Sequence, residues 1–150
     1  MTTQPAPQTA PAANANSTAM ILGVLAGVLM VAGAMFFDWL SGVDSKGTDS
    51  GVAIFWSTDP AAEPMFFASA GFVVLIMAAI TLIGAAMKRY GWVLYGGILG
   101  VLGYVLVMIS FYRFEGTDLG IGDAGLGLWM ILAGGALAIV SGVMGRRPAV

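Results

Sequence analysis

Four uninterrupted apolar runs dominate this chain, and none of them contains Asp, Glu, Lys, Arg or Pro. Each run is long enough to cross a hydrocarbon core of about 30 Å as a helix, because a helix rises about 1.5 Å per residue. Backbone groups in lipid must be satisfied within their own segment, and the alternation of a barrel strand is absent, so we expect helices. The predicted spans are residues 19–37, 65–87, 92–112 and 126–144.

Composition excludes several classes of function. Apolar residues make up 59% of the chain and charged residues only 9%, whereas roughly 25% of residues are charged in a soluble domain. We therefore predict a membrane protein, with the lipid bilayer as its first partner. The chain has no Cys and no His, which removes thiol catalysis, the commonest metal ligand and the commonest general base. We expect no metal, no cofactor and, at a net charge of −2, no nucleic acid partner.

The few charges are sorted between the connecting loops. Lys88 and Arg89 separate the second and third spans, Arg146 and Arg147 follow the fourth, and no acid shares those segments. All eight acids lie in the other two loops. Since Lys and Arg in short loops mark the cytoplasmic side, both termini are predicted to be cytoplasmic in a bacterial inner membrane.

Aromatic residues flank the spans at both ends. Phe36, Phe37 and Trp39 end the first span, and Trp92 and Tyr95 open the third. Amphipathic rings favour the headgroup level of a bilayer. We therefore expect these residues at the two membrane interfaces.

The chain is predicted to contain one four-helix transmembrane domain, residues 19–145, between two tails. The first 18 residues are uncharged and rich in Pro and Ala, so they cannot bury enough apolar surface to offset their ordering entropy. We expect residues 1–18 to form a disordered cytoplasmic tail and residues 146–150 a short second one. The alternative is a cleaved signal peptide, because Ala32-Gly33-Ala34 has the form of a cleavage site. The absence of Lys and Arg before the first span speaks against it.

Small residues recur in three spans at the spacing that lets helix backbones approach closely. Lipid supplies no hydrophobic driving force between helices, so such stripes are typical of packing faces. We favour contacts within the bundle, and the alternative is a docking face for another subunit. The residues are Gly23 and Gly27 in the first span, Gly96 and Gly100 in the third, and Gly134, Ala138 and Gly142 in the fourth.

The two outer loops resemble each other. Each contains Gly-Thr-Asp-x-Gly followed by a β-branched residue, at 47–52 and 116–121, and each later reaches a Trp. This pattern favours a duplicated helical hairpin, with halves related by an axis along the membrane normal. Chance similarity in a chain rich in Gly and Val is the alternative. Short strands are expected at 52–56 in the long first loop, where Phe55 and Trp56 are candidates for contact with a partner.

Candidate chemistry is sparse. Asp38 and Arg113 occupy corresponding places after the first and third spans, where an ion pair would tie the two halves together. The alternative is that each side chain simply extends to the interface. No ionisable residue lies at the middle of a span, which argues against a proton-coupled transporter. No nucleophile–base pair can be assembled, so we expect no enzymatic activity.

The fourth span carries a weak resemblance. The sequence Gly-Leu-Gly-Leu-Trp-Met-x-x-x-Gly-Gly from Gly125 resembles the last span of small, uncharacterised four-span bacterial membrane proteins, which implies the architecture and little about activity. Claudins have a similar shape, but their cysteine pair is missing here and Trp129 opens the fourth span, so this is an analogy of shape alone.

These features predict an all-α, four-span membrane bundle without enzymatic activity. We expect an accessory or scaffold subunit of a larger membrane assembly, with a lipid-transport or respiratory complex as a plausible host. The alternative is a small homo-oligomeric pore or lipid carrier with an acidic outer mouth, built through the stripes of the third and fourth spans.

Overall fold

Four α-helices make up most of the part of the chain that the computed structural model describes, which is residues 12–42, 44, 46–49, 66–114 and 121–146. They are α1 (Ala12–Met35), α2 (Ala70–Ala86), α3 (Tyr90–Phe114) and α4 (Leu126–Arg146). Within the described part of the connections lie the short 3-10 helices η1 (Gly47–Asp49), η3 (Phe66–Ala68) and η4 (Ile121–Asp123). The described residues contain no strand, so the all-helical prediction is confirmed for them. The strands expected at 52–56 lie outside this part of the chain.

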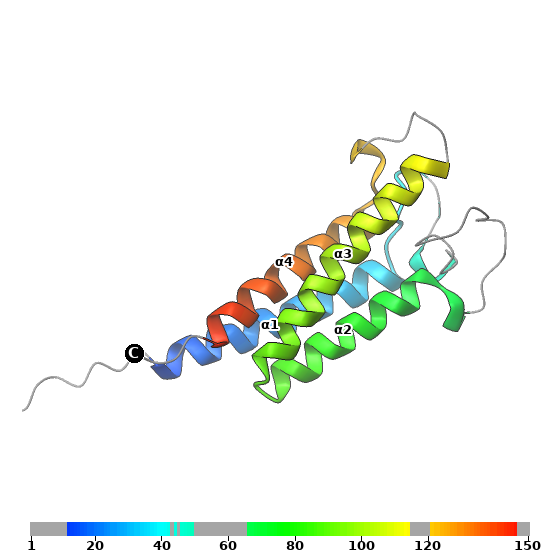
Figure 1. Ribbon diagram of the computed structural model, residues 1–150. Helices are drawn as coiled ribbons and strands as arrows, with labels where there is room; N and C mark the ends of the chain where they lie inside the picture. Colours follow the sequence, from blue (N-terminus) through cyan, green and yellow to red (C-terminus); the bar gives the residue numbers. More distant parts are fainter. Residues whose placement is uncertain (1–11, 43, 45, 50–65, 115–120, 147–150) are drawn as a thin grey trace, which may run out of the picture.

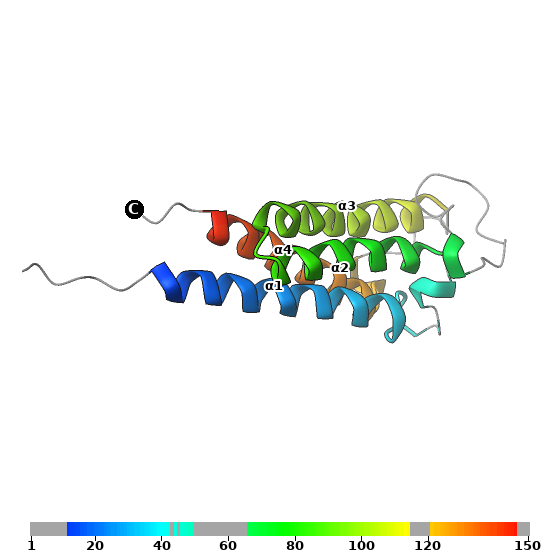
Figure 2. The same ribbon diagram turned by 90° about the horizontal axis from the view of Figure 1, so that it is seen from below.

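The four helices lie side by side along nearly the same direction (Figures 1 and 2). Helix α1 packs against α2 and α4, and α3 packs against the same two helices. The beginning of α1, the end of α4 and the turn between α2 and α3 lie at one end, which we call the basic end after Lys88, Arg89 and Arg146. The opposite end, called the acidic end, holds the described acids, Asp38, Asp44, Asp49 and Asp123.

Three of the helices are long and apolar enough to cross a membrane. They are the stretches Asn16–Met35, Tyr90–Ser110 and Leu126–Arg146. Helix α2 is apolar but has only 17 residues. The prediction of a helical membrane protein is therefore supported by these three helices.

Helix α2 begins later than the predicted second span because Ser69 caps it. The Ser69 Oγ accepts a 3.1 Å hydrogen bond from the Phe72 N–H and donates a 2.6 Å hydrogen bond to the Phe66 carbonyl oxygen. Such a cap satisfies an N–H that would otherwise be unpaired at the helix start. The residues expected to begin the span, Phe66 to Ala68, instead form η3.

Helix α1 begins earlier than expected, at Ala12 rather than Ala19. The predicted irregular tail is therefore helical over residues 12–18, and residues 1–11 lie outside the described part. Two features favour the longer helix. Alanine has the highest helix propensity, and the Tyr90 hydroxyl donates a 2.9 Å hydrogen bond to the Asn16 carbonyl oxygen. The added turns are thus held against α3.

Many small side chains lie in the interior of the bundle beside a few large ones such as Met30 and Leu128, and the outer surface carries large apolar side chains. Wholly buried positions include Ala26, Ala78 and Ala138, whereas Ile21 on α1 is 62% exposed and Leu102 on α3 is 51% exposed. Such a large apolar surface on every helix would be unfavourable in water. It is favourable in lipid, because lipid tails are as apolar as Leu. Helices in lipid associate by close approach through small residues.

Candidate functional site

The polar side chains in the described interior are few, and apart from the Tyr90 phenol none of them is ionisable. Among the described residues, the buried polar side chains are Ser69, Thr81, Ser110 and Ser141. The Thr81 Oγ1 donates a 2.9 Å hydrogen bond to the Met77 carbonyl oxygen of its own helix. The Ser141 Oγ donates a 2.6 Å hydrogen bond to the Ala19 carbonyl oxygen, which joins α4 to α1. Both hydroxyls thus donate to main-chain carbonyl oxygens.

No group of acids that could hold a metal ion is found among the described residues. The acids there lie at the acidic end, and the ion pair between Lys46 and Asp44, at 3.8 Å, is exposed. Exposed pairs of this kind contribute little to stability.

The predicted small-residue positions of α1 and α3 face other helices of the same bundle. A methyl group added at Gly23 would lie 2.9 Å from the Ala85 Cβ of α2 and 3.0 Å from the Ser141 Oγ of α4. Gly27 faces Leu82 of α2, and Gly96 faces Thr81 of α2. Gly100 faces the Met30 side chain of α1, which would lie 2.8 Å from an added methyl group.

The small residues of α4 lie where its backbone comes close to the backbones of α1 and α3. A methyl group at Gly134 would lie 2.7 Å from the Ala26 carbonyl oxygen of α1, and one at Gly142 would lie 2.8 Å from the Leu94 N of α3. Ala138 is fully buried, and its Cβ would lie 2.8 Å from a methyl group at Gly97. The α4 stripe therefore fits between α1 and α3 rather than at an outer surface.

The basic end carries the cationic side chains that the sequence singled out for topology. Lys88 and Arg89 are exposed in the turn between α2 and α3, and Lys88 has a positive φ of 55°. The Arg89 guanidinium lies over the Trp92 ring, 5.5 Å from its centroid, as a cation–π contact. Arg146 is exposed in the last turn of α4. Arg147 lies outside the described residues.

The other predicted side chains at the acidic end cannot all be placed. Asp38 follows α1 and is partly buried. Arg113 belongs to the last turn of α3, but its side chain is outside the described part, so the predicted ion pair stays a prediction. Phe55 and Trp56 also lie outside it.

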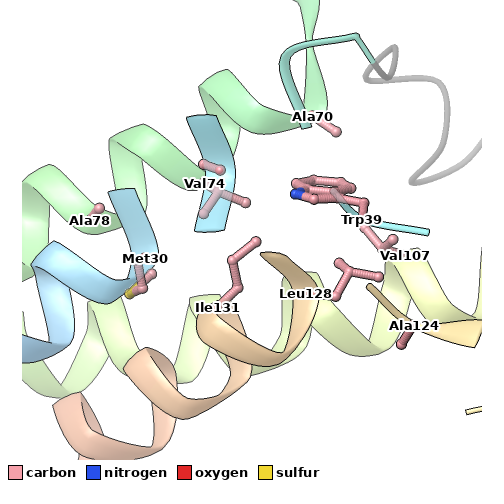
Figure 3. Packing of buried hydrophobic residues seen from close by; sticks show 10 residues of the cluster. Met30, Trp39, Ala70, Val74, Ala78, Val107, Ala124, Leu128 and Ile131 are labelled. Carbon is pink, nitrogen blue, oxygen red and sulfur yellow. The ribbon is translucent and has the colours of Figure 1, made fainter. Parts of the chain in front are cut away.

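The sequence did not reveal the role of Trp39. We expected an interfacial ring, but Trp39 is wholly buried, whereas Phe36 and Phe37 beside it are exposed. Figure 3 shows the ring between Ala70 of α2 and Leu128 of α4. The only sequence signal was the position of Trp39 two residues beyond the aromatic pair.

A compact arrangement of main-chain contacts surrounds Trp39. The Trp39 Nε1 donates a 3.0 Å hydrogen bond to the Gly33 carbonyl oxygen at the end of α1. The Gly125 N–H donates to the Trp39 carbonyl oxygen at 2.7 Å, and the Gly127 N–H donates to that of Asp38 at 2.9 Å. These bonds join the end of α1 to the beginning of α4.

The described connections show one further similarity between the two hairpins. A three-residue 3-10 helix ends one residue before Ser69 and another ends one residue before Ala124, close to the starts of α2 and α4. The first Gly-Thr-Asp motif forms η1, while residues 116–120 of the second motif lie outside the described part. The duplication therefore stays a prediction.

No family model, curated protein or solved structure matches the chain. The geometry of the bundle provides close helix packing and an outer surface of large apolar side chains.

Proposed function

We propose that this chain is a non-enzymatic accessory or scaffold subunit of a larger membrane assembly. The observation that carries the proposal is the interior of the bundle. Apolar side chains, many of them small, occupy it, and its hydroxyls at Thr81 and Ser141 donate hydrogen bonds to main-chain oxygens. Such an interior supports helix packing rather than a chemical reaction. Any contact with another molecule must therefore be made by the outer surface.

We propose further that all four helices span the bilayer. Helix α2 runs alongside its neighbours through the bundle (Figure 1). Its 17 residues cover about 25 Å at 1.5 Å per residue, and η3 adds about 6 Å at 2.0 Å per residue. This total is close to a hydrocarbon thickness of about 30 Å.

The proposed orientation follows from the two ends. Lys88, Arg89 and Arg146 lie together at the basic end, and short loops rich in Lys and Arg stay in the cytoplasm. We place the basic end, and with it both termini, on the cytoplasmic side of a bacterial inner membrane. The acidic end then faces outwards.

The contacts with a partner must come from outward-facing residues. The glycine stripes that offered a docking face are used between helices of the same bundle. The outward face of α3 is the most aromatic at the basic end, with Trp92 45% exposed and Tyr95 65% exposed. Aromatic residues are enriched where proteins contact each other. This face is therefore our first choice for the partner, with a lipid-transport or respiratory complex as a plausible host.

Native mass spectrometry after extraction in mild detergent tests the accessory role. The expected result is a defined complex of constant stoichiometry, and a photo-reactive amino acid at Tyr95 should form an adduct with the same partner. The matched control is the same amino acid at Ile21, which is 62% exposed on α1. Recovery of a lone monomer in several mild detergents, with no adduct from either position, would contradict the proposal.

The alternative, a pore made of several copies, is tested in the same preparation. The contacts expected for that pore, Gly100 and Ala138, face neighbouring helices within one bundle, which weakens the case for it. Cation leakage from liposomes that contain only the purified chain would favour the pore over the accessory role. An ion-tight liposome is the expected result.

A further inference from the structure

The turn between α2 and α3 is closed by main-chain hydrogen bonds. Only Met87, Lys88 and Arg89 separate the two helices. The Lys88 N–H donates a 3.1 Å hydrogen bond to the Ala85 carbonyl oxygen, and the Arg89 N–H donates a 2.7 Å hydrogen bond to that of Gly84. These two bonds form the Schellman motif, which satisfies carbonyl groups at the end of a helix. The closed turn therefore carries two neighbouring cations at the basic end of the bundle (Figure 2).

Lys88 stands where the end of a helix usually has a glycine. Its φ of 55° lies in the left-handed region, which glycine adopts freely and other residues avoid because their Cβ comes too close to the following carbonyl oxygen. The Lys88 side chain is exposed, so no packing contact in the interior requires it. What lysine supplies at this position, and glycine does not, is a positive charge at the surface.

Arg89 is oriented by an aromatic ring. Its guanidinium carbon lies 5.5 Å from the centroid of the Trp92 ring. This contact engages the flat face of the guanidinium, whereas the N–H donors of an arginine lie in the plane of that group. Such donors match two oxygens of one phosphate group. The Arg89–Trp92 pair therefore presents a phosphate-binding group next to Lys88.

The charge of the turn has no counterpart nearby in the chain. No acid occurs in the sequence between Glu63 and Glu115, and the described acids lie at the acidic end of the bundle. The group that complements the two cations is therefore an anion from outside the chain. We call Lys88, Arg89 and Trp92 the turn site.

Exposed apolar side chains continue from the turn site along the hairpin. Ile83 and Met87 are both exposed, and their spacing of four residues places them on one face near the end of α2. Trp92 starts beside them, because a methyl group added at Gly84 would lie 2.9 Å from the Trp92 Cβ. A ligand that suits both parts has an anionic group joined to apolar chains, which is the chemistry of a phospholipid.

We propose that the turn site binds the headgroup phosphate of an anionic phospholipid. Lys88 and Arg89 contact the phosphate oxygens, and the acyl chains lie against Ile83 and Met87. Basic sites between transmembrane helices at the membrane surface bind anionic headgroups in this way. The site needs the α2–α3 turn to lie at a membrane surface, as proposed for the four spans. It borders the face of α3 proposed for a partner but does not depend on the accessory role.

Native mass spectrometry of the whole purified chain, titrated separately with phosphatidylglycerol and phosphatidylcholine, tests this proposal. The first lipid has a net negative charge and the second has none, so the unchanged chain should bind phosphatidylglycerol more tightly. Lys88→Gly and Arg89→Gln should each weaken phosphatidylglycerol binding about fivefold, the effect of one cation near an anionic headgroup. Lys88→Gly is the sharper variant. Glycine suits the left-handed turn, so this change removes the charge while circular dichroism shows the fold retained.

Two matched variants remove a cation elsewhere. Arg146→Gln changes the basic end on α4, and Lys46→Gln changes the acidic end. Both should keep the affinity for phosphatidylglycerol. Glycerol phosphate, which has the phosphate without acyl chains, should not displace the lipid at equal concentration. Equal binding of the two lipids by the unchanged chain would overturn the proposal. Equal losses in the matched variants would overturn it too, because diffuse charge would then explain the binding, and displacement by glycerol phosphate would exclude a lipid as the ligand.

Discussion

Leu40 and Ala124 face each other in an isolated antiparallel bridge, although 84 residues separate them (124 − 40) in the sequence. Hydrogen bonds flank the pair, from the Ser41 N–H to the Asp123 carbonyl oxygen at 2.8 Å and from the Gly125 N–H to that of Trp39 at 2.7 Å. The pair itself is therefore of the non-hydrogen-bonded kind, in which Cα atoms are about 4.5 Å apart. This bridge joins the connection after α1 to the one before α4.

A disulfide should form between Leu40→Cys and Ala124→Cys, because such a pair meets the usual Cα separation of about 4.4–6.8 Å. Alkylation followed by mass spectrometry of the purified double variant should show no free thiol. The control is Leu40→Cys with Leu126→Cys, whose second residue is exposed at the start of α4 and should remain reduced. Two free thiols in the first variant after mild oxidation would mean that the bridge is not formed.

The closeness of α1 and α4 predicts a cost for a single methyl group. Gly134→Ala should lower the free energy of unfolding by about 1–3 kcal/mol, as overpacking does, because the new methyl group would meet the Ala26 carbonyl oxygen. Gly103→Ala is the matched control on α3, since its nearest neighbour is the flexible Met77 end at 3.7 Å. It should be neutral or stabilise by about 0.5–1 kcal/mol, because Ala favours the helix over Gly.

Unfolding in mixed lipid–detergent micelles, followed by circular dichroism, compares the two glycine variants with the unchanged chain. Equal stability losses at Gly134 and Gly103 would contradict the close approach of α1 and α4. A loss at Gly103 alone would place α3 in the wrong register.

The Ser141 hydroxyl joins two helices, and the Thr81 hydroxyl does not. Ser141→Ala should therefore destabilise the bundle by about 0.6 kcal/mol, with an upper limit of about 1.7 kcal/mol for such bonds in membranes. Thr81→Val keeps the shape of the side chain and removes only a bond within α2, so its effect should be smaller. The same unfolding measurement compares the two variants. A larger loss of stability for Thr81→Val than for Ser141→Ala would contradict the roles given to the two hydroxyls.

The sequence was a good guide to the helices and a poor guide to how they end. Runs without charge or Pro predict helices because lipid or a buried interior demands satisfied backbone groups, and α4 begins at the predicted Leu126. The beginnings of α1 and α2 depend on single contacts, at Asn16 and at Ser69. The first contact joins residues 74 apart and leaves no hydropathy signal, whereas the second is a local Ser cap, which is read from residue type rather than from hydropathy.

The role of Trp39 could not be predicted for a similar reason. An aromatic residue just after a span is typical of an interfacial ring, and Phe36 and Phe37 are indeed exposed. Burial of Trp39 requires Gly47 and Gly127 to leave space for the indole, since added methyl groups there would meet the ring. These glycines come from different connections, so their common function appears only when the chain is folded.

The orientation of the bundle yields the last prediction. Because Lys88, Arg89 and Arg146 cluster at the basic end, and cytoplasmic segments retain such residues, Ser41→Cys at the opposite end should react with a membrane-impermeant maleimide added to intact cells. Ser41 is exposed in the structure. Ala149→Cys, three residues after Arg146, should react only after the cells are permeabilised. Ala85→Cys is the control for burial, since Ala85 is fully buried, and it should react slowly in both conditions. Labelling of Ala149→Cys in intact cells, with Ser41→Cys protected, would invert the proposed orientation and place the acidic end in the cytoplasm.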